Sequence, residues 1–65
     1  MLKLYDIVKL KNERPDLKIK TNNIGVVVDV LKDGEAYTVE FTDENGDTIE
    51  NSLFVEFKEN ELEKA

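Results

Sequence analysis

The longest apolar run in the chain covers residues 24–31, and four of its eight residues are valine. Valine and isoleucine favour strands, so this run predicts a central strand that is buried on at least one face. Its five valine and isoleucine side chains cannot all face inward under strict alternation. The run therefore predicts either a β-bulge or burial on both faces. We expect Gly25 to permit a strained turn or a bulge where this strand begins.

Shorter apolar stretches on both sides predict further strands. Residues 36–42 alternate regularly, and this pattern places Tyr37, Val39 and Phe41 inside. Residues 4–10 predict the first strand, with Val8 and Leu10 on one face. Residues 48–55 predict a fourth strand, whose expected inward side chains are Ile49, Leu53 and Val55. The tail predicts one 3₁₀ turn over residues 58–61 and then a short pairing strand through Leu62.

The segments between these runs carry turn signals. Asp33-Gly34 predicts a tight hairpin turn, and Asn45-Gly46 is a strong hairpin signal. Residues 11–23 form the longest irregular segment, and we expect one or both of Leu17 and Ile19 to tuck beneath it and close the core. Asn22 and Asn23 tolerate left-handed backbone and are expected to set up the entry into the central strand. Together, these elements predict a single all-β domain, a five-stranded SH3-like barrel over residues 1–65 with one long loop after its first strand.

Charge narrows the range of partners. The chain has 65 residues and a net charge of −6. Residues 1–20 carry six bases and three acids (+3), whereas residues 21–65 carry three bases and twelve acids (−9). This balance disfavours nucleic acid and anionic membranes and favours a protein with a basic surface. The protein is expected to be cytoplasmic, without a membrane span, and a monomer or weak homodimer.

Catalytic and metal chemistry finds little support in the sequence. Cysteine and histidine are both absent, so thiolate metal sites and the usual nucleophilic triads are not expected. Residues 43–47 resemble the start of a calcium loop, but the required glycine and glutamate are replaced by Thr48 and Phe54. Glu59 and Glu61 would need a pocket for acid–base work, and a barrel this small is expected to fill its interior. We expect a protein without cofactors that is not an enzyme.

The order of motifs resembles the DUF4926 family of small bacterial proteins of unknown function. The resemblance covers nearly the whole chain and rests on Tyr5-Asp6-Ile7-Val8-Lys9-Leu10, Leu17-Lys18, Ile24-Gly25-Val26-Val27-Val28-Asp29-Val30, Tyr37-Thr38-Val39-Glu40-Phe41, Asp43-Glu44-Asn45-Gly46 and Leu62. It implies an SH3-like barrel and no defined catalytic residues. Some members sit beside candidate toxin genes, which implies antitoxin or immunity roles. Residues 21–23 depart from the glycine-containing turn that is more common in relatives.

Three functions follow as hypotheses. The first is an acidic protein–protein interaction module of the antitoxin or immunity type. The second is an RNA- or ribosome-associated barrel of the KOW kind that works through its basic loop, namely Lys11, Arg14, Lys18 and Lys20. The third is an accessory subunit of a larger enzyme, which exposed Leu2, Phe54 or Phe57 would support. By analogy with other SH3-like barrels, the predicted protein-binding residues lie between the long loop and the first hairpin: Tyr5, Arg14, Asp16, Lys32, Asp33 and Glu35.

Overall fold

The computed structural model describes residues 1–65, and all its regular elements are strands or short 3₁₀ helices. In chain order these are β1 (Ile7–Leu10), η1 (Pro15–Leu17), β2 (Ile24–Leu31), η2 (Lys32–Gly34), β3 (Ala36–Thr42), η3 (Glu50–Phe54), η4 (Glu59–Glu61) and β4 (Leu62–Lys64). No helix has the length and apolar character needed to cross a bilayer. The all-β class predicted from the sequence is confirmed.

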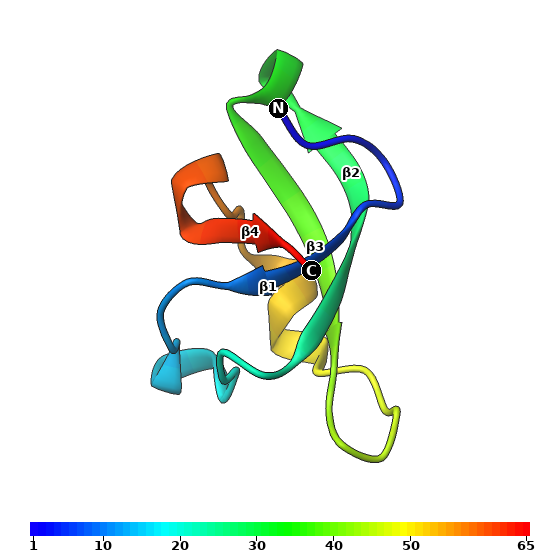
Figure 1. Cartoon of the computed structure of the whole chain (residues 1–65), viewed down its shortest axis with the longest axis vertical. Coiled ribbons are helices and arrows are strands. Elements are labelled where there is room, and N and C mark those ends of the chain that lie inside the picture. Colours follow the sequence, from blue (N-terminus) through cyan, green and yellow to red (C-terminus); the bar gives the residue numbers. More distant parts are fainter.

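The four strands form one antiparallel sheet in the order β3-β2-β1-β4. In Figure 1, β2 and β3 make a long ribbon with η2 at its upper end, and β1 and β4 lie across this ribbon. The sheet is therefore strongly bent, as expected for twisted strands around a small core. It is open, with β3 and β4 as its edges, so the predicted closed barrel of five strands is not what the structure shows.

The β2–β3 hairpin follows the sequence pattern closely. Both strands have the predicted bounds, and the register shifts between Val27 and Asp29. This shift is a β-bulge at Val28, one of the two predicted solutions to the excess of valine and isoleucine. The bulge allows both the fully buried Val27 and the partly buried Val30 to face the core, whereas Val28 is 37% exposed.

The core lies on one face of this bent sheet. Tyr37, Val39 and Phe41 all face it with no exposed surface, as their alternation predicts. Leu17 and Ile19 from the long loop are also buried, so that prediction is confirmed as well. The cluster comprises eleven side chains: Leu2, Val8, Leu10, Leu17, Ile19, Val27, Tyr37, Val39, Phe41, Phe57 and Leu62.

The strand predicted over residues 48–55 is wrong. Only Thr48 forms an isolated bridge to β3, and the chain then enters η3. The cause is Ser52, which is completely buried and whose Oγ accepts a hydrogen bond from the Phe41 N–H at 3.2 Å. A neighbouring strand would supply a carbonyl at this point; here a side chain takes its place, because serine readily bonds to nearby backbone. Leu53, expected to face inward, is consequently 40% exposed.

The prediction for the C-terminal residues is confirmed. The predicted turn over residues 58–61 is η4, and β4 begins at Leu62 and pairs with β1. Between η3 and η4, Phe57 pairs with Tyr37 through two backbone hydrogen bonds on the outer edge of β3. That edge is therefore covered by Phe57 and η3 rather than by a fifth strand.

Several local predictions need correction. The first strand begins at Ile7, not at Leu4, because Tyr5 adopts a left-handed conformation with φ of 70°. The residues with positive φ in the long loop and first hairpin are Lys18, Lys32, Asp33 and Gly34, and neither Asn22 nor Asn23 is among them. Asn23 instead accepts a hydrogen bond from the Lys20 N–H at 2.7 Å through Oδ1. The first hairpin loop contains residues 32–35, which is wider than a two-residue turn.

Gly25 also has a different role from the one expected. Its φ is not positive, and the bulge lies three residues later. A Cβ atom at this position would lie 2.6 Å from Val39 Cγ1 and 2.8 Å from Phe41 Cδ1. Gly25 is therefore required by the close packing of β3 side chains over β2, not by backbone conformation.

Candidate functional site

Among the six predicted binding residues, only Arg14 and Asp16 are joined by side-chain hydrogen bonds. Arg14 precedes η1, and its Nη2 atom lies 3.1 Å from Asp16 Oδ2. The hydrogen bonds that Arg14 donates to Asp16 raise the pKa of Arg14 and hold the pKa of Asp16 below its ordinary value. These two residues form an ion pair at the start of η1.

Arg14 also holds the long loop against the C-terminal segment. Its Nη1 atom lies 3.2 Å from Glu61 Oε2, and its guanidinium carbon lies 5.9 Å from the centre of the Phe57 ring. This guanidinium is therefore shared between two carboxylates and stacked over an aromatic ring. Because its hydrogen-bonding capacity is largely used within the protein, Arg14 is poorly placed to bind a phosphate, as the nucleic-acid hypothesis would require.

The other predicted residues lie elsewhere. Lys32, Asp33 and Glu35 belong to the β2–β3 turn, at the opposite end of Figure 1 from η1. Tyr5 lies on the segment before β1, where its N–H donates to the Val27 carbonyl at 2.7 Å and its side chain is 73% exposed. The six residues do not form one continuous surface.

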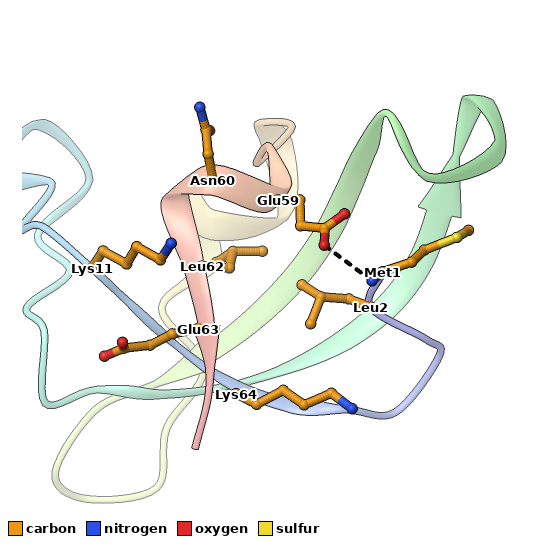
Figure 2. A pocket seen from close by; sticks show the side chains of 8 residues that line it. All are labelled: Met1, Leu2, Lys11, Glu59, Asn60, Leu62, Glu63 and Lys64. Atoms are coloured by element: carbon orange, nitrogen blue, oxygen red, sulfur yellow. Dashed lines mark ion pairs between the residues drawn. The ribbon is translucent and has the colours of Figure 1, made fainter.

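A surface depression of about 780 Å³ lies beside β4, between this strand and the first residues of the chain (Figure 2). The sequence led us to expect no hollow of this size; this one is an open depression on the surface, outside the filled core. Its lining mixes charges of both signs with two core leucines: Met1, Leu2, Lys11, Glu59, Asn60, Leu62, Glu63 and Lys64.

Glu59 is the most connected carboxylate of this depression. The Met1 amino group lies 3.1 Å from its Oε2 atom, shown as the dashed line in Figure 2. The Tyr37 hydroxyl donates to Glu59 Oε1 at 3.4 Å and accepts a hydrogen bond from the Leu2 N–H at 3.2 Å. Glu61 is likewise engaged, with Arg14 and with the Lys58 N–H at 2.9 Å. Glu59 therefore ties the N-terminus to β3, and Glu61 ties the long loop to the turn before β4.

The calcium-like segment is an ordinary turn. Asp43 Oδ1 accepts hydrogen bonds from the N–H groups of Asn45 and Asp47 at 2.9 and 3.0 Å. Gly46 closes the turn with φ of 84°. Groups of three or more potential ligand side chains, whether histidine, cysteine, aspartate or glutamate, do not gather anywhere on the chain.

The outer face of the sheet carries an apolar patch that the sequence reasoning missed. Ile7 on β1 lies directly opposite Val26 on β2, and their neighbours Val8 and Gly25 face the core. Ile24 and Val28 lie two residues to either side of Val26 on the same strand and are 38% and 37% exposed. We call Ile7, Ile24, Val26 and Val28 the outer patch. The solvated face of an antiparallel sheet is ordinarily polar, so four β-branched side chains here require an explanation.

Three carboxylates and one lysine, Lys9, lie around the outer patch. Glu40 lies opposite Val26 on β3, and Asp29 lies opposite Thr38, which alternates outward between Tyr37 and Val39. Glu63 on β4 lies opposite Lys9 on β1. Alternation from Ile24 already places Val26 and Val28 on this face, so the sequence carried a signal for them. The bulge at Val28 turns Asp29 to the same face, which no period-2 pattern predicts.

The three side chains proposed as signs of a larger assembly behave differently. Leu2 and Phe57 are buried in the core, whereas Phe54, at the end of η3, is 83% exposed. Of the three side chains whose exposure would support the accessory-subunit hypothesis, only Phe54 is exposed. Phe54 is also the most exposed large hydrophobic side chain of the protein.

Comparison with protein-family models gives one match. The model for a domain of unknown function, DUF4926, matches residues 4–63. The chain belongs to the DUF4926 family. Comparisons with curated proteins and with solved structures returned no match. Membership in DUF4926 confirms the resemblance noted in the sequence, and it assigns no activity to the outer patch or to the depression beside β4.

Proposed function

We propose that this DUF4926 protein is a binding module, without catalytic activity, that docks its outer patch on a protein with a basic surface. The observation that carries the proposal is the outer patch itself, an apolar centre of Ile7, Ile24, Val26 and Val28 inside a rim that includes Asp29, Glu40 and Glu63. Protein interfaces commonly combine an apolar centre with a polar rim.

The charge of the chain supports a basic partner over the alternatives. At a net charge of −6, a second copy of the chain is repelled at long range, as is any polyanion. The nucleic-acid alternative is further weakened because Arg14, a member of the basic loop, is bound by Asp16 and Glu61. A partner with lysine or arginine around an apolar surface matches both the charge and the chemistry of the outer patch.

An antitoxin or immunity role is one form of this function. A protein of that type acts by covering a basic surface that its target needs, and it requires affinity rather than a reaction centre. The engagement of Glu59 and Glu61 in structural contacts supports binding over acid–base catalysis.

The experiment compares two double variants of equal net charge. Asp29→Asn with Glu63→Gln neutralises the rim, whereas Glu13→Gln with Glu35→Gln neutralises two exposed carboxylates elsewhere; each changes the net charge from −6 to −4. A partner is isolated with the wild-type chain from cells that express it, purified, and its affinity measured by calorimetry at several salt concentrations.

We expect the rim variant to weaken binding about tenfold, which corresponds to about 1.4 kcal/mol, and the control variant to change it much less. Ile7→Ser should weaken binding without altering the salt dependence, because it removes apolar contact and no charge. Equal losses in the two double variants, or affinity that is insensitive to salt, would rule out the outer patch as the docking surface.

A further inference from the structure

The register between β1 and β4 fixes which backbone groups of β4 point away from the sheet. The Lys11 N–H donates to the Glu61 carbonyl at 2.9 Å, and the Ala65 N–H donates to the Ile7 carbonyl at 3.0 Å. Bonded pairs recur at every second residue of an antiparallel ladder. Glu63, midway between these two bonds, therefore also directs its N–H and carbonyl to β1.

The residues on either side of Glu63 direct their backbone groups to the free edge of β4. The Leu62 N–H is used within the chain, where it donates to the Glu59 carbonyl and closes η4. The Leu62 carbonyl and both backbone groups of the exposed Lys64 have no partner in β1, and they take no part in the hydrogen bonds of the loops and turns. An edge with such unpaired groups is suited to pairing with an extended segment of another chain.

The depression beside β4 leaves this edge accessible. β1 occupies one edge of β4, and the depression lies on the other side, between β4 and the first residues of the chain. In Figure 2, Glu63 points to one side of β4, whereas Leu62 and Lys64 point to the other. An added strand would lie about 4.8 Å from β4, and the depression of about 780 Å³ leaves that space open.

The charges of β4 oppose pairing with a second copy of the chain. A symmetric antiparallel pair would be centred on residue 62, 63 or 64. These registers place Glu61 opposite the second copy's Glu63, Glu63 opposite its own counterpart, or Lys64 opposite its own counterpart. Each puts like charges directly across the strands, which destabilises pairing. The net charge of −6 adds repulsion at long range.

The side chain of Glu63 indicates which residue an added strand would place beside it. Glu63 is exposed and takes part in none of the four ion pairs of the protein, although Lys9 lies opposite it on β1. A basic residue on the free-edge side would supply the missing opposite charge. The residues before and after it would face the other side of the sheet, where Leu2 and Leu62 line the depression.

We propose that the free edge of β4 pairs antiparallel with an extended segment of a partner protein, in which one basic residue lies beside Glu63 between two apolar residues. Lys11 and Lys64 also line the depression and would repel a polybasic segment, so a single basic residue is expected. This inference rests on the proposed function in taking the partner to be basic, and it adds main-chain pairing as the mode of recognition.

The test uses a defined peptide and the full chain. An acetylated, amidated peptide, Gly-Val-Arg-Val-Gly, is titrated into the protein and followed by NMR. We expect the Glu63 and Lys64 amide signals to shift and saturate, with Lys64 moving downfield because its N–H gains an acceptor. With about 90% of the chain bound, hydrogen exchange of the Lys64 amide should slow about tenfold, because only the free fraction exchanges.

Two modified peptides separate main-chain pairing from attraction between side chains. Methylation of both valine nitrogens keeps the charge and removes the N–H groups that would donate to the Leu62 and Lys64 carbonyls. Citrulline in place of arginine keeps the shape and removes the charge. We expect binding to weaken about tenfold with the methylated peptide and about threefold with the citrulline peptide.

Two variants of Lys64 isolate its N–H group. Lys64→Pro removes this donor and none of the hydrogen bonds to β1, and proline is tolerated in edge strands where the N–H faces solvent. Lys64→Gln keeps the N–H and loses the same ion pair with Asp6, so it is the matched control. Lys64→Pro should abolish the saturable shift of the Glu63 amide, whereas Lys64→Gln should retain it. Slow exchange of the Glu63 amide in the proline variant verifies that β4 still pairs with β1.

Wild-type affinity in Lys64→Pro, or equal binding of the methylated peptide, would overturn the inference. The methylated peptide decides the question by itself if proline disturbs β4. Equal binding of the citrulline peptide would overturn the basic residue beside Glu63, and a Lys64 shift that grows with protein concentration alone would identify a second copy as the occupant. Ile24→Ser, in the outer patch, should leave peptide binding unchanged, so this inference and the proposed function can fail separately.

Discussion

Replacing Gly25 with alanine tests the packing on which the fold depends. The added Cβ would lie 2.6 Å from Val39 Cγ1 and 2.8 Å from Phe41 Cδ1, distances that real Cβ contacts essentially never show. Both side chains are fully buried, so neither can swing into solvent. The backbone of Gly25 lies outside the left-handed region, so alanine is compatible with its conformation and only the clash opposes it.

The magnitude follows from two opposing effects. Overpacking a well-filled core costs about 1–3 kcal/mol. The lower entropy of an unfolded chain with alanine offsets only about 0.4–1 kcal/mol. We expect the free energy of unfolding to fall by about 1–2 kcal/mol, and Tm to fall by about 4–8 °C for each kcal/mol in a domain of this size. Urea unfolding followed by circular dichroism measures the first quantity and a thermal scan the second.

A double-mutant cycle identifies the cause. Val39→Ala removes the atom nearest the new methyl group, so the double variant should lose less stability than the sum of the single variants, by about 1 kcal/mol. Gly46→Ala is the control: nothing lies within 4 Å of a Cβ there, but φ is +84°, so its cost comes from backbone strain and should add to that of Val39→Ala without coupling. A neutral Gly25→Ala variant, or strict additivity with Val39→Ala, would refute the described contact between β2 and β3.

Three further changes probe the contacts that tie the loops to the sheet. Ser52→Ala should lower the free energy of unfolding by about 1–3 kcal/mol, because it leaves the buried Phe41 N–H without its partner. Asn51→Ala, at the exposed neighbouring residue, should change this free energy by less than about 0.5 kcal/mol. Equal effects of the two substitutions in urea unfolding would contradict the role of Ser52. Arg14→Lys should lower the free energy of unfolding by about 1 kcal/mol although it conserves the charge, because lysine cannot pair with Asp16 and Glu61 while stacking on Phe57. Unchanged stability would show that these contacts of Arg14 are dispensable. Two aspartates have pKa values below the ordinary 3.8: Asp6 accepts a hydrogen bond from the Lys3 N–H, and Asp16 accepts hydrogen bonds from Arg14. The stability that these carboxylates contribute is therefore present above pH 3.8 and is lost as the pH falls through their folded-state pKa values. NMR titration should place both carboxyl groups below 3.8, and Asp6→Asn should reduce the loss of stability in acid; ordinary titration of either group would contradict its contact.

The protein-binding prediction illustrates where sequence reasoning fails. It placed residues of the long loop and the first hairpin on one surface by analogy with a closed barrel. The structure separates Arg14 and Asp16 from Lys32, Asp33 and Glu35 because the long loop precedes β2 and the turn follows it, so the length of this strand lies between the two segments (Figure 1). The outer patch, by contrast, depends on the cross-strand register of Ile7 and Val26, which no single strand specifies.

The alternation of residues 36–42 and the valine-rich run were sufficient to determine the two long strands and the inward side chains of β3, and Asn45-Gly46 marked the turn where β3 ends. The alternation of apolar and polar residues and the residue types that favour turns are local properties of the chain, so the sequence alone reveals them. The structure alone decided three things: that Ser52 replaces a strand with a 3₁₀ helix, that the bulge turns Asp29 outward, and that Arg14 is bound within the protein. Each depends on which distant groups lie opposite one another across the sheet, and that information exists only once the chain has folded.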